Sequence, residues 1–161
     1  MQFTALLISA LSTLTFAAPA PVPATDNITA RTCTPYYAEG GQFYLQKDAG
    51  SPSSTQVVSF TVPVPVPGPC SLIARFPPGH PIYTSGDAQI NVFSGEGSNA
   101  PGSLVGTVTL SSDPHEVKTV TINSFQCFGH LSYRFELATQ GAGSVSFPQG
   151  YGAGIALTYG C

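Results

Sequence analysis

The sequence predicts an all-β protein, and three observations carry this prediction. Apolar residues recur at every second position along much of the chain, which is the period of a half-buried strand. The 17 glycines and 15 prolines interrupt this pattern at short intervals. Only 8% of the residues are charged, and this composition argues against long helices, which need Glu, Lys and Arg in quantity. We therefore expect a two-sheet antiparallel β-sandwich, jelly-roll-like, with about 8–9 short strands.

The clearest predicted strand covers residues 131–138. Here Leu131, Tyr133 and Phe135 alternate with polar residues such as Arg134 and Glu136, which gives one apolar and one polar face. No helical pattern separates this strand from its neighbours, so antiparallel pairing is expected. The other alternating runs lie at 43–45, 58–62, 71–76, 89–92, 104–110, 117–122, 145–147 and 155–159.

The N-terminal segment has the pattern of an export signal. An apolar run from Phe3 to Phe16 ends in small residues, which predicts a signal peptide over residues 1–17 with cleavage after Ala17. The run is too short and too rich in Ser and Thr to span a bilayer. Residues 18–32 alternate Pro with small residues and are expected to form a leader or linker, and residues 33–161 a single domain. The protein is thus expected to be secreted and extracellular.

Four cysteines and one glycosylation motif agree with export. Cys33, Cys70, Cys127 and Cys161 lack the close spacing of zinc or thioredoxin motifs, so two structural disulfides are expected in an oxidising compartment. Three pairings are possible. We favour Cys33 with Cys161, which would fasten the last strand, and Cys70 with Cys127. Asn27, in the motif Asn-Ile-Thr, is the expected glycosylation site.

Several segments together resemble a fungal secreted domain family. They are GPCSLIARFPPGHPI (68–82), INVF (90–93), GSLVGTVTL (102–110), NSFQC (123–127), LSYRFELAT (131–139), GSVSFPQG (143–150) and GAGIALTYGC (152–161). The chain is similar over residues 33–161 to the C-terminal domain of the "But" proteins, which are described as binding a subunit of a ubiquitin-like-modifier activating enzyme. The resemblance implies a ubiquitin-pathway partner and supplies no catalytic residue.

The sequence contains no assembled catalytic or metal-binding motif that we can recognise. The three histidines, His80, His115 and His130, are dispersed and sit in turn-like contexts, and no GxSxG nucleophile turn is present. We expect no catalytic residue, no cofactor and no metal. The net charge of −3 with five Lys and Arg also argues against nucleic-acid and membrane partners.

A hydrolase is the alternative that the carboxylates allow. Glycosidase chemistry needs two carboxyl groups about 5–10 Å apart in a cleft, and Glu136 with Asp113 or Glu116 is the candidate set. Glu136 also lies two residues after Arg134 on the same strand face, so a simple ion pair between them is the favoured interpretation.

Tyrosines are the sequence feature that points to binding. Tyr133 and Tyr159 fall on apolar strand faces and are expected in the core, whereas Tyr36, Tyr37 and Tyr151 fall in predicted loops. Exposed tyrosines can stack on sugar rings. The favoured function is therefore a secreted non-catalytic protein, extracellular or associated with the cell wall, that binds polysaccharide, a cell-surface glycan or another surface partner.

The favoured cysteine pairing makes a testable prediction. Changing Cys161 to Ser frees the last strand and leaves Cys33 unpaired, so we expect a loss of about 2–5 kcal/mol in the free energy of unfolding and poor secretion. Cys33→Ser should lower the free energy of unfolding by the same amount. The double variant should be no less stable than either single variant, because both changes remove the same bridge. Non-reducing peptide mapping checks the pairing directly, and Cys161 joined to Cys70 or Cys127 would contradict it.

Overall fold

The structure is a computed structural model that describes residues 33–161 except 64, 66–67, 98–99, 128 and 160–161. The expected signal peptide (1–17), the leader or linker (18–32) with Asn27, and Cys161 lie outside the described residues. None of the cysteines that are described is free.

The regular elements of the described residues are strands. None of these residues belongs to a helix long and apolar enough to cross a membrane. The strands are β1 (Thr34–Tyr37), β2 (Gly41–Lys47), β3 (Thr55–Thr61), β4 (Pro69–Phe76), β5 (Tyr83–Gly86), β6 (Gln89–Ser94), β7 (Leu104–Thr109), β8 (Lys118–Gln126), β9 (His130–Leu137), β10 (Gly143–Gln149) and β11 (Gly154–Tyr159).

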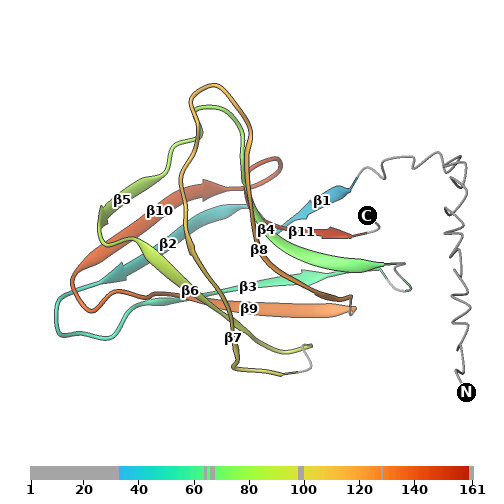
Figure 1. The fold of residues 1–161 in the computed structure, drawn as a ribbon, viewed down its shortest axis with the longest axis horizontal. Coiled ribbons are helices and arrows are strands. Elements are labelled where there is room, and N and C mark those ends of the chain that lie inside the picture. Colours follow the sequence, from blue (N-terminus) through green and yellow to red (C-terminus); the bar gives the residue numbers. More distant parts are fainter. Residues whose placement is uncertain (1–32, 64, 66–67, 98–99, 128, 160–161) are drawn as a thin grey trace, which may run out of the picture. The chain divides into compact units, whose positions relative to one another are not determined.

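These strands form three antiparallel sheets, and the predicted all-β sandwich is confirmed. Sheet I has the order β1-β11-β4-β8, sheet II the order β2-β10-β5, and sheet III the order β3-β9-β6-β7. Figure 1 shows β3 and β9 of sheet III below β4, β10 and β11. A short turn with the Gly150–Ala153 bridge joins β10 to β11. Beyond it β10 pairs with β2 and β5 whereas β11 pairs with β1 and β4, so the two strands belong to different sheets.

The structure has eleven strands over the described residues, more than the 8–9 expected. The additional strands, β1 and β5, are four residues long and lie at sheet edges, where β1 pairs with β11 and β5 with β10. All four side chains of β5 are exposed, so the strand shows no apolar alternation. Tyr36 and Tyr37, expected in a loop, belong to β1. Short edge strands leave little pattern because neither face of them is fully buried.

Four phenylalanines form the centre of the core and join the three sheets. Phe43 of β2 stacks on Phe147 of β10 with 4.6 Å between ring centroids, and it meets Phe135 of β9 edge-on at 5.4 Å. Phe76 of β4 meets Phe147 edge-on at 5.1 Å. All four rings are fully buried. Such offset and edge-on pairs contribute about 0.5–1.5 kcal/mol each beyond the burial of area.

One disulfide fastens the pair of strands β4 and β8. Cys70 lies on β4 and Cys127 directly follows β8, with 5.1 Å between their Cα atoms. The neighbouring residues Pro69 and Gln126 are paired in the register of the two strands. The predicted pairing of Cys70 with Cys127 is confirmed.

Strands β7 and β8, which belong to different sheets, approach each other closely at a glycine. A Cβ atom added to Gly106 of β7 would lie 2.7 Å from the carbonyl oxygen of Ile122 and 2.9 Å from its Cγ2. Sheets I and III therefore meet along this edge of the sandwich with no room for a side chain. We call it the closed edge.

The close contact at the closed edge predicts that a larger residue at Gly106 destabilises the protein. Gly106→Ala places a methyl group against the backbone of Ile122, so we expect the free energy of unfolding to fall by about 1–3 kcal/mol, measured by urea denaturation. Gly150→Ala is the control, because nothing lies within 4 Å of its Cβ position. Gly→Ala is ordinarily stabilising where the backbone allows it, so a Gly106→Ala protein as stable as the wild type would contradict the contact.

Candidate functional site

The outer strands β1 of sheet I and β3 of sheet III border a groove of about 370 Å³. Its walls combine aromatic, amide, hydroxyl and carboxylate side chains. We call it the tyrosine groove, and the residues of its lining that matter below are Tyr36, Tyr37, Glu39, Gln56, Ser59 and Gln149.

Two of the three tyrosines singled out in the sequence line this groove, and the third packs against one of them. Tyr36 and Tyr37 are neighbours on β1 and line it, and Tyr151 lies in the turn between β10 and β11. The rings of Tyr37 and Tyr151 are tilted, with 6.2 Å between centroids. Tyr36 rests edge-on against the buried Phe60 at 6.5 Å and is 42% exposed, while Tyr151 is fully exposed. Part of each ring system is thus fixed by packing and part is open to solvent.

Gln56 occupies the gap between β2 and β3, which are not paired by a backbone ladder. Its Oε1 accepts a hydrogen bond of 2.7 Å from the backbone N–H of Tyr44, and its Nε2 donates to the carbonyl oxygen of Gln42 at 3.4 Å. The side chain takes the place of a missing backbone partner, which holds it in one orientation beside the groove.

Gln149 is held in a similar way at the other wall. Its Oε1 accepts a hydrogen bond of 3.2 Å from the backbone N–H of Ile155. Its side chain also lies so close to Gly154, which has a φ of +109°, that a Cβ there would be 2.8 Å from Cγ of Gln149. Both amides of the groove are therefore positioned by backbone groups before any ligand arrives.

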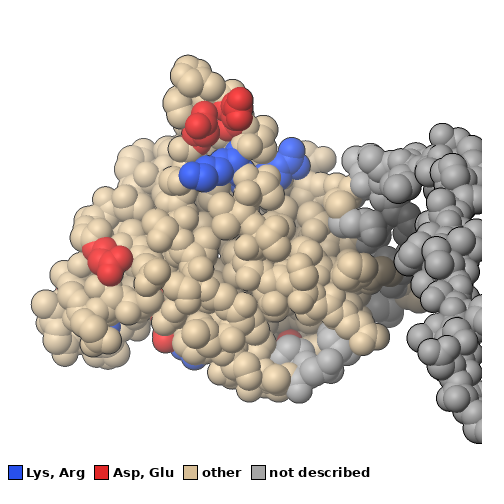
Figure 2. Space-filling model, in the orientation of Figure 1, with Lys and Arg blue, Asp and Glu red and all other residues tan. Residues whose placement is uncertain are grey.

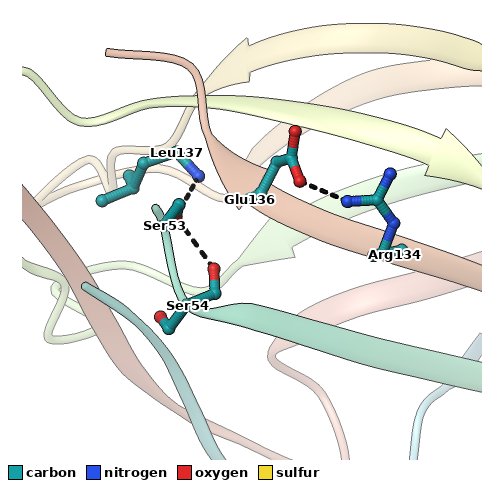
Figure 3. Close-up of polar contacts among 5 residues, drawn as sticks. All are labelled: Ser53, Ser54, Arg134, Glu136 and Leu137. Carbon is teal, nitrogen blue, oxygen red and sulfur yellow. Dashed lines mark hydrogen bonds and ion pairs between the residues drawn. The ribbon is translucent and has the colours of Figure 1, made fainter. Parts of the chain in front are cut away.

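Glu136 of β9 forms the expected ion pair with Arg134 on the same strand face (Figure 3). The guanidinium group of Arg134 also lies over the ring of Phe93, 4.3 Å from its centroid, which adds a cation–π contact. Beside this pair, the backbone N–H of Leu137 donates to Oγ of Ser53 at 2.9 Å. Glu136 is thus held in an ion pair on the outer face of sheet III.

Asp113 and Glu116 lie in the loop between β7 and β8, away from Glu136. Oδ1 of Asp113 accepts hydrogen bonds from the backbone N–H groups of His115 at 2.7 Å and of Glu116 at 3.0 Å. These bonds hold the pKa of Asp113 below its usual range, because they favour the charged carboxylate. In Figure 1 this loop lies at the top and β9 near the bottom. The structure does not bring the carboxylates of the hydrolase hypothesis together.

The histidines are also apart. His80 stacks on Phe76 with 5.4 Å between centroids, and its Nε2 is 2.9 Å from the carbonyl oxygen of Pro148. His115 and His130 are exposed on a loop and on β9. Within the described ranges no three His, Cys, Asp or Glu side chains form a group that could hold a metal ion.

Charge is sparse on the surface, and uncharged residues cover most of the face drawn in Figure 2.

Comparison of the chain with protein-family models, with curated proteins and with solved structures finds no match.

The sequence indicated Tyr36 and Tyr37 of the groove but not Glu39, Gln56 and Gln149. Glu39 lies in a loop, Gln56 near the start of β3 and Gln149 at the end of β10, and polar residues at such positions are common everywhere on a β protein. The one signal was the closeness of Tyr36 and Tyr37 in sequence, which placed exposed aromatic area on one short segment.

The role of Gln56 is testable without a ligand. Gln56→Ala removes the acceptor of the Tyr44 N–H, so we expect the free energy of unfolding to fall by about 0.5–1.5 kcal/mol and the Tyr44 amide to exchange its hydrogen faster. Gln42→Ala is the matched control, since it shortens an exposed glutamine of the neighbouring strand. Equal amide exchange in the two variants would show that Gln56 does not bridge β2 and β3.

Proposed function

We propose that this protein is an exported, non-catalytic glycan-binding protein, extracellular or associated with the cell wall, and that polysaccharide binds in the tyrosine groove. One observation carries the proposal. Tyr36 and Tyr37 on β1 line one groove that also presents two fixed amides and a carboxylate, and Tyr151, more than a hundred residues later in the chain, packs against Tyr37.

The chemistry of the groove fits sugar rings. A hexose has an apolar face that packs on an aromatic ring, and hydroxyl groups at its edge that both donate and accept hydrogen bonds. Amide side chains match this edge because they also donate and accept, and a carboxylate accepts. The exposed part of Tyr36 and the fully exposed Tyr151 offer the flat surfaces, and Gln56, Gln149 and Glu39 offer the polar partners.

The disulfide supports the proposed extracellular location. Disulfides persist in oxidising environments such as the extracellular space and are rare in the cytosol. The Cys70–Cys127 bridge therefore agrees with export, and it counts against the alternative function that the family resemblance implies, a ubiquitin-pathway partner inside the cell.

The hydrolase alternative receives less support. A glycosidase needs its two carboxyl groups about 5–10 Å apart across a cleft, whereas Glu136 is ion-paired on β9 and Asp113 and Glu116 lie in the β7–β8 loop. Among the residues that the structure describes, the lining of the tyrosine groove has one carboxylate, Glu39. This arrangement favours binding without hydrolysis.

Sedimentation of the protein with insoluble chitin, β-glucan and cellulose tests the proposal. We expect retention on at least one of them, and Tyr36→Ala and Tyr151→Ala should each weaken binding by about 0.5–1.5 kcal/mol, roughly 2- to 12-fold, because each removes one stacking surface. Tyr83→Ala is the matched control, since Tyr83 is 65% exposed on β5 and, unlike Tyr151, neither lines the groove nor packs against a tyrosine that does.

Two results would contradict the proposal. The first is retention on none of the three polysaccharides by a protein whose thermal unfolding shows that it is folded. The second is equal loss of binding in the Tyr83→Ala control, which would place the bound surface elsewhere. Release of soluble sugar from the polysaccharide over time would instead support the hydrolase.

A further inference from the structure

A second hollow lies on the outer face of sheet III, beside the tyrosine groove. It has a volume of about 510 Å³, and we call it the outer hollow. Its floor and walls come from β3, β9 and the loop that follows β6. The residues of its lining used below are Val57, Ser59, Glu96, His130, Ser132 and Arg134.

The groove and the hollow share a wall. Val57 and Ser59 of β3 line both of them. Both side chains are exposed and alternate with the buried Val58 and Phe60, so they stand on the outer face of the sheet. The tyrosine groove and the outer hollow therefore lie on either side of β3. A ligand in the groove that extends across β3 reaches the outer hollow.

The side chains between the two depressions are small, so they form only a low ridge that a ligand can cross. Ser59 is paired in register with Ser132 of β9, and both side chains end in a hydroxyl group. The strands β3, β9 and β6 are neighbours in the sheet, so the surface beyond the groove extends over about 10 Å at the usual strand spacing. That length accommodates more than one sugar ring.

The far wall of the outer hollow is fixed by backbone contacts. The N–H of Gly95 donates to the carbonyl oxygen of Ser132 at 2.8 Å, and the N–H of Ser132 donates to that of Glu96 at 3.0 Å. A Cβ on Gly97, which has a φ of +80°, would lie 1.7 Å from the carbonyl oxygen of His130. The loop after β6 thus lies directly on β9, and glycine is required for this approach.

The charges of the two depressions select against an anionic ligand. Arg134 is the one Lys or Arg in their described linings, and its charge is paired with Glu136. Glu39 in the groove and Glu96 in the hollow are exposed carboxylates. A chain of uronic acids or of sulfated sugars would meet these carboxylates without a free cation, which is unfavourable.

We infer that the tyrosine groove and the outer hollow are successive parts of one cleft for a neutral glycan chain, which crosses β3 over Ser59. This inference rests on the proposed glycan binding. It adds the length of the ligand and its charge: a chain of several neutral sugars, in which the sugars over the tyrosines stack and those in the outer hollow are hydrogen-bonded by the exposed hydroxyl group of Ser59 and by the guanidinium group of Arg134.

Calorimetric titration with oligosaccharides of increasing length tests the inference. The probes are chito-, cello- and laminari-oligosaccharides from the disaccharide to the hexasaccharide, with oligogalacturonates as the anionic series. For the neutral series that binds, we expect affinity to rise at least about tenfold from the shortest to the longest member. The oligogalacturonates should not bind.

Substitutions in the outer hollow separate its contribution from that of the groove. His130→Trp fills the hollow from an exposed position on β9, and Glu96→Trp fills it from the loop; Thr109→Trp is the matched control on the exposed face of β7, outside both depressions. We expect either variant to lower the affinity for the hexasaccharide by about tenfold and to leave the disaccharide unchanged. The control should alter neither, and thermal unfolding confirms that each variant is folded.

The outcomes distinguish the inference from the function on which it rests. If affinity is independent of length while Tyr36→Ala weakens binding, the groove binds glycan alone and the inference is overturned. Oligogalacturonates that bind as tightly as the neutral series would also overturn it. If no oligosaccharide and no polysaccharide binds the folded wild-type protein, the proposed function fails as well.

Discussion

The packing of four phenylalanines is the interaction on which the rest of the structure depends. Phe43, Phe147, Phe76 and Phe135 belong to three sheets whose backbones are separate ladders, so hydrogen bonds alone do not hold these sheets together. Burial of the rings does, and it fixes how far apart the sheets stand. The width of every opening between them, including the tyrosine groove, follows from this spacing.

The two long edges of the sandwich differ, and the difference explains where a site can form. At β7 and β8 the sheets touch because Gly106 has no side chain to separate it from Ile122, and the Cys70–Cys127 bridge fastens β8 to β4. At β1 and β3 the sheets leave a groove instead, with Tyr36 and Tyr37 in its lining. One closed and one open edge thus give a rigid frame in which the tyrosine groove lies at the open edge.

Much of this frame could be predicted from the sequence, and the limits have a physical cause. The alternation at Leu131, Tyr133 and Phe135 predicts a strand because one face of it is buried, and the structure buries those three residues. β1 and β5 escaped prediction because exposed edge strands carry no such alternation. The division into three sheets, and the groove between β1 and β3, depend on pairings between distant segments. A local pattern does not encode those pairings, although the tyrosines indicated that exposed aromatic area is concentrated on β1.

The open edge of the sandwich exposes strands that could pair with another chain, and the side chains at the groove reduce this risk. Unpaired strand edges can pair with another chain, and proteins protect them with short strands, charges or covering side chains. Here β1 has four residues, Glu39 follows it, and Gln56 satisfies the backbone of β2 where β3 diverges from it. The groups that prevent edge-to-edge pairing are polar, fixed and half-exposed, and these are also the properties that a site for sugar hydroxyls requires. Protection of the edge and the glycan binding that we propose thus place the same demands on the same few residues.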